Sequence, residues 1–361
     1  MTRMANPISS STSPSTTWKE DVEPGEHELF ERFARDVIMP RQREIAQRTA
    51  GPVGRCLHFK IHSGLMAEFR VLPDLPAHAR FGVFGEPRVL PCLVRFSNGE
   101  SFSKPDKGPQ PRGIAIKLVG VPGPKLLEDQ KKAVTQDFLA TSHSVTSGVR
   151  HVRQFMDFLE SAIEAEHRHL PLLFLPSLYR RLGVREAARI QLFLLRTVVL
   201  TKVRSLATEH YTSPAPIKFG RYAVRFTVRP AGGTTPAAKG RQTDDFLREE
   251  LADRLRVEDL NFDFAVQFYV NERSTPIEDT SVPWNANFVT LARLRIPKCD
   301  LTDPRTEALS EAVNRLSFNP WHAIEDHRPL GNVMRARKVA YQVSSEFRHH
   351  DPEPTSLPLK T

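Results

Sequence analysis

The sequence predicts an α+β fold in which helices surround an antiparallel β-barrel. Short segments alternate between apolar and polar residues and are separated by Gly, Pro and Asp turns, a pattern typical of a closed or nearly closed barrel. Segments with helical spacing of apolar residues lie between them. We expect strands within residues 51–71 and at residues 79–84, 89–96, 113–119, 222–228, 262–270 and 287–296. We expect helices at residues 24–48, 151–166, 176–206 with a break near Gly183, 243–255, 305–316 and 335–348.

Composition narrows the class of protein. The 361 residues are 40% hydrophobic and 26% charged, enough to bury one large core. The net charge of +9 is scattered among acidic residues, which argues against a nucleic-acid partner. Three cysteines lie far apart without a CxxC pair and indicate free thiols in a reducing, cytoplasmic compartment. We expect no membrane span: the most apolar run, residues 192–203, is interrupted by Arg196 and Lys202 and fits a core helix or the wall of a hydrophobic substrate channel.

The chain divides into three parts by composition. Residues 1–22 begin with a stretch rich in Ser, Thr and Pro that has no apolar run, so we expect a disordered leader there. Residues 23–350 contain no repeat and no Pro-rich linker, which predicts a single domain. We expect a flexible tail at residues 351–361. The helical arm at residues 24–48 would pack on a neighbouring surface, which leaves a homo-oligomer open.

The segment at residues 335–348 gathers chemically distinctive side chains. Arg337, Tyr341 and Arg348 are four and then seven residues apart, so a helix brings them to roughly one side. A phenolate is a hard ligand that suits ferric iron, and a guanidinium one turn away stabilises it. The second arginine can pair with a carboxylate at the edge of a flat cofactor. Taken alone, this segment is better explained as a basic amphipathic helix, whose Tyr and Val residues serve only for packing, than as an iron-binding segment.

An ordered series of further motifs changes that balance. From the N-terminal side it comprises Arg55-Cys56-Leu57-His58-Phe59-Lys60, Val94-Arg95-Phe96-Ser97-Asn98, Pro111-Arg112-Gly113-Ile114-Ala115-Ile116-Lys117-Leu118, Gln136-Asp137-Phe138, Tyr211-Thr212-Ser213-Pro214-Ala215-Pro216, Phe318-Asn319-Pro320-Trp321-His322 and His327-Arg328-Pro329-Leu330-Gly331. In these motifs, spread between about residues 51 and 350, the chain resembles the haem-dependent catalase family, specifically its shorter catalase-related, peroxidase-like branch. The resemblance implies a catalase-like barrel with a haem pocket between the barrel and the C-terminal helix.

The resemblance also implies the cofactor and its contacts. It implies haem b, iron protoporphyrin IX, with Tyr341 as the iron ligand and Arg337 as its charge partner. It makes His58 the distal acid and base, with Ser97 as its hydrogen-bond partner. The other haem contacts that it implies are Arg55, Arg95 and Arg348 on the propionates and Phe155 over the distal face.

One stretch departs from the family pattern. Full-length catalases place an asparagine over the haem, whereas residues 141–151 contain none. At ungapped spacing Ser142 takes that position, with His143 beside it. Losing one positioned donor costs about 10²-fold or more in rate, which argues against fast dismutation of hydrogen peroxide.

We therefore expect a haem-dependent enzyme that breaks down hydrogen peroxide or organic hydroperoxides with an unidentified reductant. One alternative is a fatty-acid hydroperoxide isomerase or dehydratase similar to allene oxide synthase, acting on a lipid hydroperoxide. Those relatives carry a threonine before the distal histidine, and Leu57 at that position argues against this alternative. The other is a non-catalytic haem-binding protein, against which the retained His58 argues.

Overall fold

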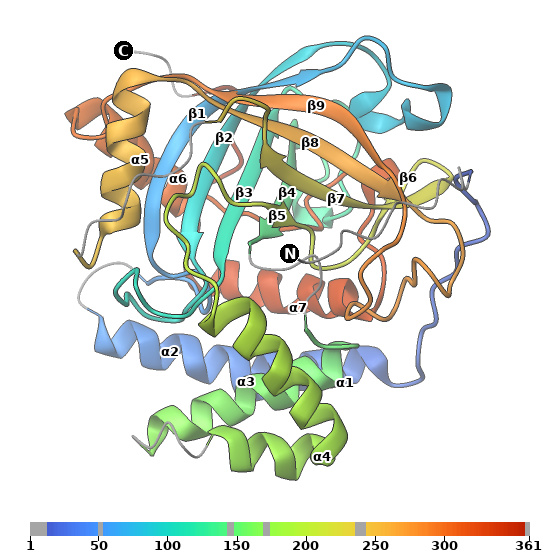
Figure 1. Cartoon of the computed structure of the whole chain (residues 1–361), viewed down its shortest axis with the longest axis vertical. Helices are drawn as coiled ribbons and strands as arrows, with labels where there is room; N and C mark the ends of the chain where they lie inside the picture. Colours follow the sequence, from blue (N-terminus) through green and yellow to red (C-terminus); the bar gives the residue numbers. More distant parts are fainter. Residues whose placement is uncertain (1–12, 50–52, 143–147, 169–173, 235–242, 358–361) are drawn as a thin grey trace, which may run out of the picture.

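A closed β-barrel forms the centre of the molecule (Figure 1). The structure, a computed structural model, describes residues 13–49, 53–142, 148–168, 174–234 and 243–357. Within them a nine-stranded antiparallel sheet has the order β5-β4-β3-β2-β1-β9-β8-β7-β6. The strands are β1 Ile61–Val71, β2 Val89–Asn98, β3 Arg112–Val119, β4 Thr135–Thr141, β5 Tyr211–Thr212, β6 Ile217–Phe219, β7 Tyr222–Pro230, β8 Leu260–Phe268 and β9 Phe288–Ile296. Because β5 pairs with both β4 and β7, the sheet closes, which confirms the predicted barrel.

Aromatic side chains pack the interior of the barrel. Phe69, Phe226 and Phe264 are at most 2% exposed. The rings of Phe226 and Phe264 stack with centroids 5.1 Å apart, and Phe69 meets Phe264 edge-on at 5.3 Å. Inward residues come from every second position of the strands, as the pleat requires. This dense packing leaves no room there for a planar cofactor, so a cofactor site has to lie between the barrel and its helices.

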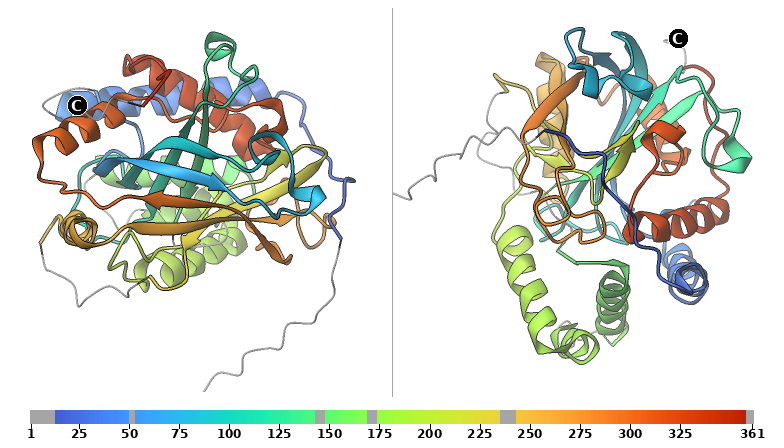
Figure 2. Two further views of the ribbon diagram at one scale, coloured as in Figure 1. Left: turned by 90° about the horizontal axis from the view of Figure 1, so that it is seen from above. Right: turned by 90° about the vertical axis from the view of Figure 1, so that its right-hand side faces the viewer.

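Helices gather mainly on one side of the barrel. They are α1 Glu26–Phe33, η1 Ala34–Ile38, α2 Met39–Arg48, α3 Val152–His167, α4 Phe174–Leu194, η6 Leu195–Val199, α5 Phe246–Val257, α6 Pro304–Arg315 and α7 Asn332–Phe347. Figure 1 shows α7 directly below the barrel, with α1 to α4 further out on the same side. In Figure 2 the pair α3 and α4 stands apart from the layer of α7, α1 and α2. Helix α7 contacts α1, α2 and α3, so it is the innermost helix of this side.

The predicted strands are confirmed except at residues 79–84, and β4, β5 and β6 were not predicted. Residues 79–84 contribute instead to the 3-10 turns η2 Ala77–Ala79 and η3 Gly82–Phe84. Gly82 has a φ of 54°, which an extended strand does not contain, and the apolar pattern reflects burial of Val83 and Phe84 in the core. Strand β4 was not predicted because it buries polar as well as apolar residues, among them Gln136 and Asp137, and so lacks alternation.

The helix predictions hold, with one correction of burial. Helix α4 is interrupted at Gly183 as expected, with φ 75° and ψ 166° there, and the helical run ends with η6 at Val199. The run at residues 192–203 was expected to be a core helix or a channel wall. Instead Leu192, Val199 and Leu200 are 45%, 54% and 67% exposed, so the core assignment is wrong.

The described parts of both terminal segments contact the folded body. In the segment expected as a leader, residues 1–12 lie outside the described residues, while the indole of Trp18 donates a hydrogen bond to the Arg221 carbonyl over 2.9 Å. In the segment expected as a tail, Glu353 accepts a hydrogen bond from Lys117 over 2.6 Å. The single domain over residues 23–350 stays a prediction.

We expect Gly64→Ala to destabilise the protein by about 1–3 kcal/mol, because α6 packs directly on β1 at this glycine. A Cβ there would lie 2.5 Å from Cβ of Val313, and the Gly64 amide donates to the Ser310 hydroxyl over 2.9 Å. Equilibrium urea denaturation of the full chain measures the effect. Gly232→Ala is the control, since a Cβ at that position meets nothing within 4 Å. Equal stability of the two variants would contradict this packing.

Candidate active site

The inner face of α7 carries a paired arginine and tyrosine. Arg337 and Tyr341 stand one turn apart, and Nη2 of Arg337 donates a hydrogen bond of 2.6 Å to the Tyr341 hydroxyl. The guanidinium carbon also lies 4.8 Å from the centre of the Tyr341 ring. The arginine therefore places positive charge both on the phenol oxygen and over the ring. Arg348 is the C-terminal capping residue of the same helix.

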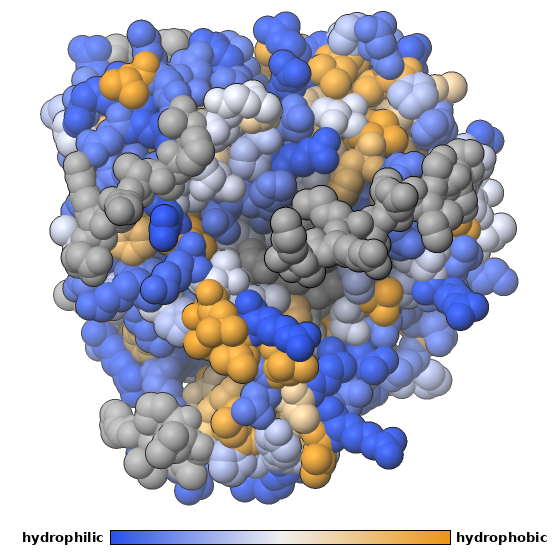
Figure 3. Space-filling model, viewed as in Figure 1, coloured by the Kyte–Doolittle hydropathy of each residue, from blue (hydrophilic) through white to orange (hydrophobic). Residues whose placement is uncertain are grey.

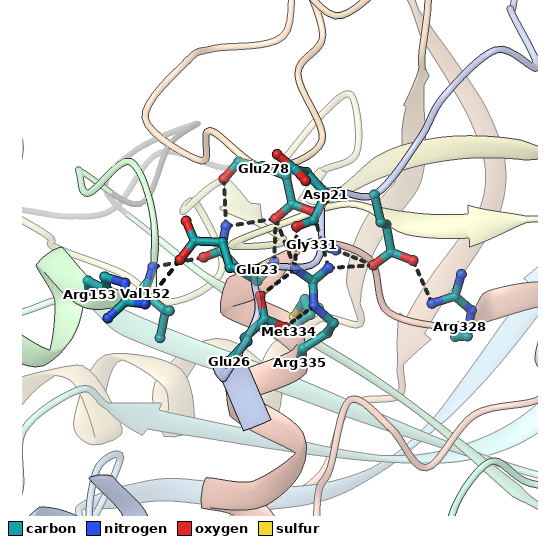
Figure 4. A network of polar contacts seen from close by, with 12 residues as sticks. Asp21, Glu23, Glu26, Val152, Arg153, Glu278, Arg328, Gly331, Met334 and Arg335 are labelled. Atoms are coloured by element: carbon teal, nitrogen blue, oxygen red, sulfur yellow. Dashed lines mark hydrogen bonds and ion pairs between the residues drawn. The ribbon is translucent and has the colours of Figure 1, made fainter. Parts of the chain in front are cut away.

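A network of acidic residues fixes the start of α7 (Figure 4). Arg335 forms ion pairs with Glu20, Glu26 and Glu278, which come from the N-terminal segment, α1 and the loop before β9. Burial opposes the charge of Arg335, but these carboxylates raise its pKa above the ordinary value. Glu278 also accepts from the backbone amide of Asn332, the first residue of α7. Three separate segments thus hold the helix that presents Arg337 and Tyr341.

His58 is held against the barrel by its backbone and its ring. Its φ of 57° is left-handed, and its amide donates to the carbonyl of Gly99 over 3.2 Å. Nδ1 of the imidazole lies 3.0 Å from the hydroxyl of Ser97 on β2. Gly113 on β3 pairs with Ser97, and a Cβ at Gly113 would lie 2.6 Å from Nδ1 of His58. The absence of that Cβ lets the ring approach the sheet, and Ser97 leaves Nε2 of the ring for another partner.

The environment keeps His58 uncharged. Burial lowers the pKa of His58 to about 3. Three nearby positive charges act in the same direction, those of Arg95, Arg337 and Arg55. Arg337 belongs to α7, so its effect shows that the histidine and the tyrosine face the same region. By solvent exposure His58, Arg337 and Tyr341 are half-buried, so each side chain is largely but not fully shielded from water.

Three further arginines lie beside this region, of which Arg95 is buried and Arg55 and Arg348 are half-buried. Burial lowers the pKa of Arg95 to about 9 and that of Arg348 to about 10, and it lowers the pKa of Arg55 well below its ordinary value. The positive charges repel one another, whereas Tyr341 favours the charged forms of Arg55 and Arg95. Within the described residues none of the three arginines forms an ion pair, and Nε of Arg348 is buried without a hydrogen-bond partner. A cluster of positive charges that is partly shielded from water attracts an anion, so the site suits a ligand with acidic groups.

Asn314 near the end of α6 positions two of these arginines and was not predicted. Its side-chain oxygen accepts hydrogen bonds from Arg55 over 3.0 Å and from Arg95 over 3.1 Å. Arg55 also donates to the carbonyl of Leu316 over 2.7 Å. A lone asparagine in a surface helix gives no signal in the sequence, because its role depends on packing between α6 and the barrel.

Phe155 lies on α3 where two apolar clusters meet. It packs against the cluster that contains Cys56 and Ala336 and against the cluster that contains Leu178 of α4. This position connects α3 with the side of the barrel that carries the candidate site. Coverage of a haem face by Phe155 stays a prediction.

The role of Ser142 also stays a prediction. It is buried, and its hydroxyl accepts a hydrogen bond of 3.0 Å from the backbone amide of Arg112. In the register between β3 and β4, the partner of Gly113 is Thr141, so Thr141 shares the face on which His58 lies. Residues 143–147, including His143, lie outside the described residues. Sequence reasoning passed over Thr141 because β4 was not recognised.

No group of three or more His, Cys, Asp or Glu side chains in the described residues is arranged to hold a metal ion. Among the helices of the same residues, none combines the length and apolar character that crossing a bilayer demands.

Comparisons with known proteins agree on the fold. No family model matches the chain. The chain is 27% identical over 268 residues to a catalase-related peroxidase from Mycolicibacterium paratuberculosis, an alignment that covers 72% of this chain and 78% of that protein.

Solved structures of catalases superpose on the barrel and its helices. A fungal catalase gives a TM-score of 0.64 at 16% identity and covers 85% of this chain, which spans 62% of that chain. A bacterial catalase gives a TM-score of 0.61 at 14% identity, and the alignment covers 96% of this chain and 67% of that chain. Catalase A from Saccharomyces cerevisiae gives a TM-score of 0.59 at 14% identity, and the alignment covers 95% of this chain and 69% of that chain. The chain thus has the catalase fold, and its similarity to a catalase-related peroxidase confirms the family resemblance that its motifs predict.

Proposed function

We propose that this chain binds haem b and uses it to break down hydrogen peroxide or small organic hydroperoxides. The observation that carries the proposal is the convergence of two hydrogen-bonded pairs, Arg337 with Tyr341 and His58 with Ser97, on one region lined by arginines. The catalase-related peroxidase and the catalases to which the chain is similar support peroxide as the substrate.

The residues present fit haem. Tyr341 offers a phenolate oxygen to iron, and Arg337 already donates to that oxygen. The cluster of Arg55, Arg95 and Arg348 forms no ion pair among the described residues, and the two propionates of haem b would supply negative charge there. When bound, haem would supply a ferric iron that can take up the oxidising equivalents of a peroxide.

His58 moves the proton that cleavage of a peroxide requires. The neutral imidazole accepts a proton at Nε2 from the peroxide oxygen that approaches the iron, and it returns the proton to the outer oxygen, which departs as water or an alcohol. The Ser97 hydroxyl at Nδ1 fixes the orientation of the ring throughout. The low pKa of His58 means that the imidazole is ready to act as a base without first losing a proton.

The proposal includes organic hydroperoxides because no distal asparagine is present in residues 141–151. Without that amide donor the outer oxygen of hydrogen peroxide is held less firmly, which favours a peroxidase with an organic reductant over a fast catalase. Cys56, Cys92 and Cys299 are free thiols, which supports a reducing, cytoplasmic location.

Tyr341→Phe should lower haem binding by at least about 10- to 100-fold, because it removes the oxygen that would coordinate iron. Haem content is read from the absorbance of the purified, reconstituted chain, and circular dichroism reports folding. Tyr179→Phe is the matched control, since the Tyr179 hydroxyl bonds Gln191 on α4, away from this site. Unchanged haem content in Tyr341→Phe would assign the ligand elsewhere.

His58→Asn should retain haem but lower the rate of peroxide consumption by about 10²- to 10⁴-fold, since it removes proton transfer. Asparagine suits the substitution because it tolerates the left-handed backbone of His58. Oxygen evolution from hydrogen peroxide and consumption of an organic hydroperoxide, assayed on the same haem-loaded sample, separate catalase from peroxidase activity. Exposed His27→Asn serves as the control. Equal rates in both variants would show that His58 does not transfer the proton, and the absence of peroxide consumption by the wild type would leave only a haem-binding role.

The peroxide reaction of the haem-loaded chain should show no titration of His58 between pH 5 and 8, because its pKa is lowered to about 3. In the unfolded chain the same histidine binds a proton below about pH 6.5. Its contribution to folding stability is therefore present above that value and is lost as the pH falls toward 3. Rapid-mixing rates across the pH range test the first statement, and a step centred near pH 6.5 would contradict it.

A further inference from the structure

The second half of α4 and the following η6 expose apolar side chains to solvent. Val184, Leu192, Leu195, Val199 and Leu200 are 72%, 45%, 44%, 54% and 67% exposed. Hydrophobic residues gather on this lower part of the molecule in Figure 3, where Figure 1 draws α4. We name these five residues the apolar stripe.

The spacing places four of the five residues on one side of the helix. Leu192 follows Val184 by eight residues, Leu195 follows by three and Val199 by four, which are the intervals that return to the same side. Leu200 directly follows the end of η6 and extends the exposed apolar surface beyond it. The opposite side is packed: Ala187 and Ile190 are at most 1% exposed and belong to the cluster that joins α4 to α3. The stripe therefore exposes a second apolar face on a helix whose core contact is already complete.

Positive charge borders the apolar stripe. Residues 174–204 contain seven basic residues and one acidic residue, Glu186. Glu186 forms ion pairs with Arg189 and Arg150, on the side of the helix away from the apolar stripe. Arg185, one residue after Val184, and Arg196, one residue after Leu195, are exposed and take part in no ion pair within the part of the chain that the structure describes.

We propose that the apolar stripe docks on an anionic lipid surface, with Arg185 and Arg196 against the headgroups. Leucine and valine side chains enter the boundary between headgroups and acyl chains, while arginines beside them reach phosphate groups and remain hydrated. Each basic residue near an anionic membrane strengthens binding by about fivefold, and the exposed apolar residues add the hydrophobic part. The contact is peripheral and leaves the fold unchanged.

The charge pattern disfavours a second copy of this chain as the occupant. A symmetric dimer through the apolar stripe would bring Arg185 and Arg196 of both copies together, and the stripe offers no carboxylate to pair with them. Interface cores are depleted of charge, whereas membrane-surface helices favour arginine beside leucine. The lipid surface complements both the charge and the apolar character.

Sedimentation of the haem-loaded full chain with vesicles tests the proposal. Phosphatidylcholine vesicles with and without phosphatidylserine are compared for the wild type, for Leu195→Asn with Val199→Asn, and for Arg185→Gln with Arg196→Gln. Val257→Asn at the end of α5 is the control, because Val257 is 74% exposed and lies outside the apolar stripe. Haem content and circular dichroism show that each variant remains folded.

The wild type and the control should bind the phosphatidylserine vesicles equally. The apolar pair and the arginine pair should each weaken that binding by about tenfold or more, and the arginine pair should abolish the preference for phosphatidylserine. Failure of the wild type to bind, or binding by the apolar pair as tight as by the control, would overturn the proposal. Gel filtration tests whether a second copy of the chain binds the stripe instead. If the wild type is an oligomer that the apolar substitutions dissociate, and if it does not bind vesicles, the stripe is an interface between copies. None of these readouts depends on peroxide activity.

Discussion

A cluster of positive charge that has no counter-ion among the described residues is the constraint on which the candidate site depends. Arg95 and Arg348 both lower the pKa of Arg55, and Arg348 lowers that of Arg95. Among the described residues, Arg55 and Arg95 donate hydrogen bonds to backbone carbonyls and to the Asn314 side chain. Burying a cation costs several kcal/mol unless an opposite charge is close. Three such groups around a tyrosine favour an anionic ligand, and the two carboxylates of the proposed porphyrin would match that charge.

Elements from both ends of the chain set the geometry around that charge. The barrel fixes His58 through Ser97 and Gly113, and α7 presents Tyr341 from the C-terminal side. Because α7 is tied by Arg335 to the N-terminal segment, the residues before α1 also stabilise the site. The packed barrel core excludes a ligand from the interior, so the proposed cofactor would bind between the barrel and α7.

Local patterns predicted the parts of this arrangement that depend on local spacing. The interval of four residues between Arg337 and Tyr341 guarantees contact on any helix, and the alternating strands predicted the barrel without its register. The face on which Thr141 lies depends on how β4 pairs with β3, and the role of Asn314 depends on where α6 meets the barrel. Both are consequences of long-range packing, so no local pattern contains them. The exposed stripe on α4 was misread for a related reason: an apolar helix has the same sequence whether its second face is covered or open.

Buried cations elsewhere in the same protein are compensated in two different ways. Lys117 on β3 is fully buried, and burial opposes its charge. The carboxylates of Asp137 and Glu353, 2.8 and 2.6 Å away, nevertheless raise its pKa above the ordinary value. Arg225 and Lys125 are also buried, but among the described residues they contact backbone carbonyls and form no ion pair. The lack of a carboxylate alone therefore does not distinguish the candidate site. The arginines beside Tyr341 differ because they lie close together, so their positive charges add in one region, which favours an anionic ligand there.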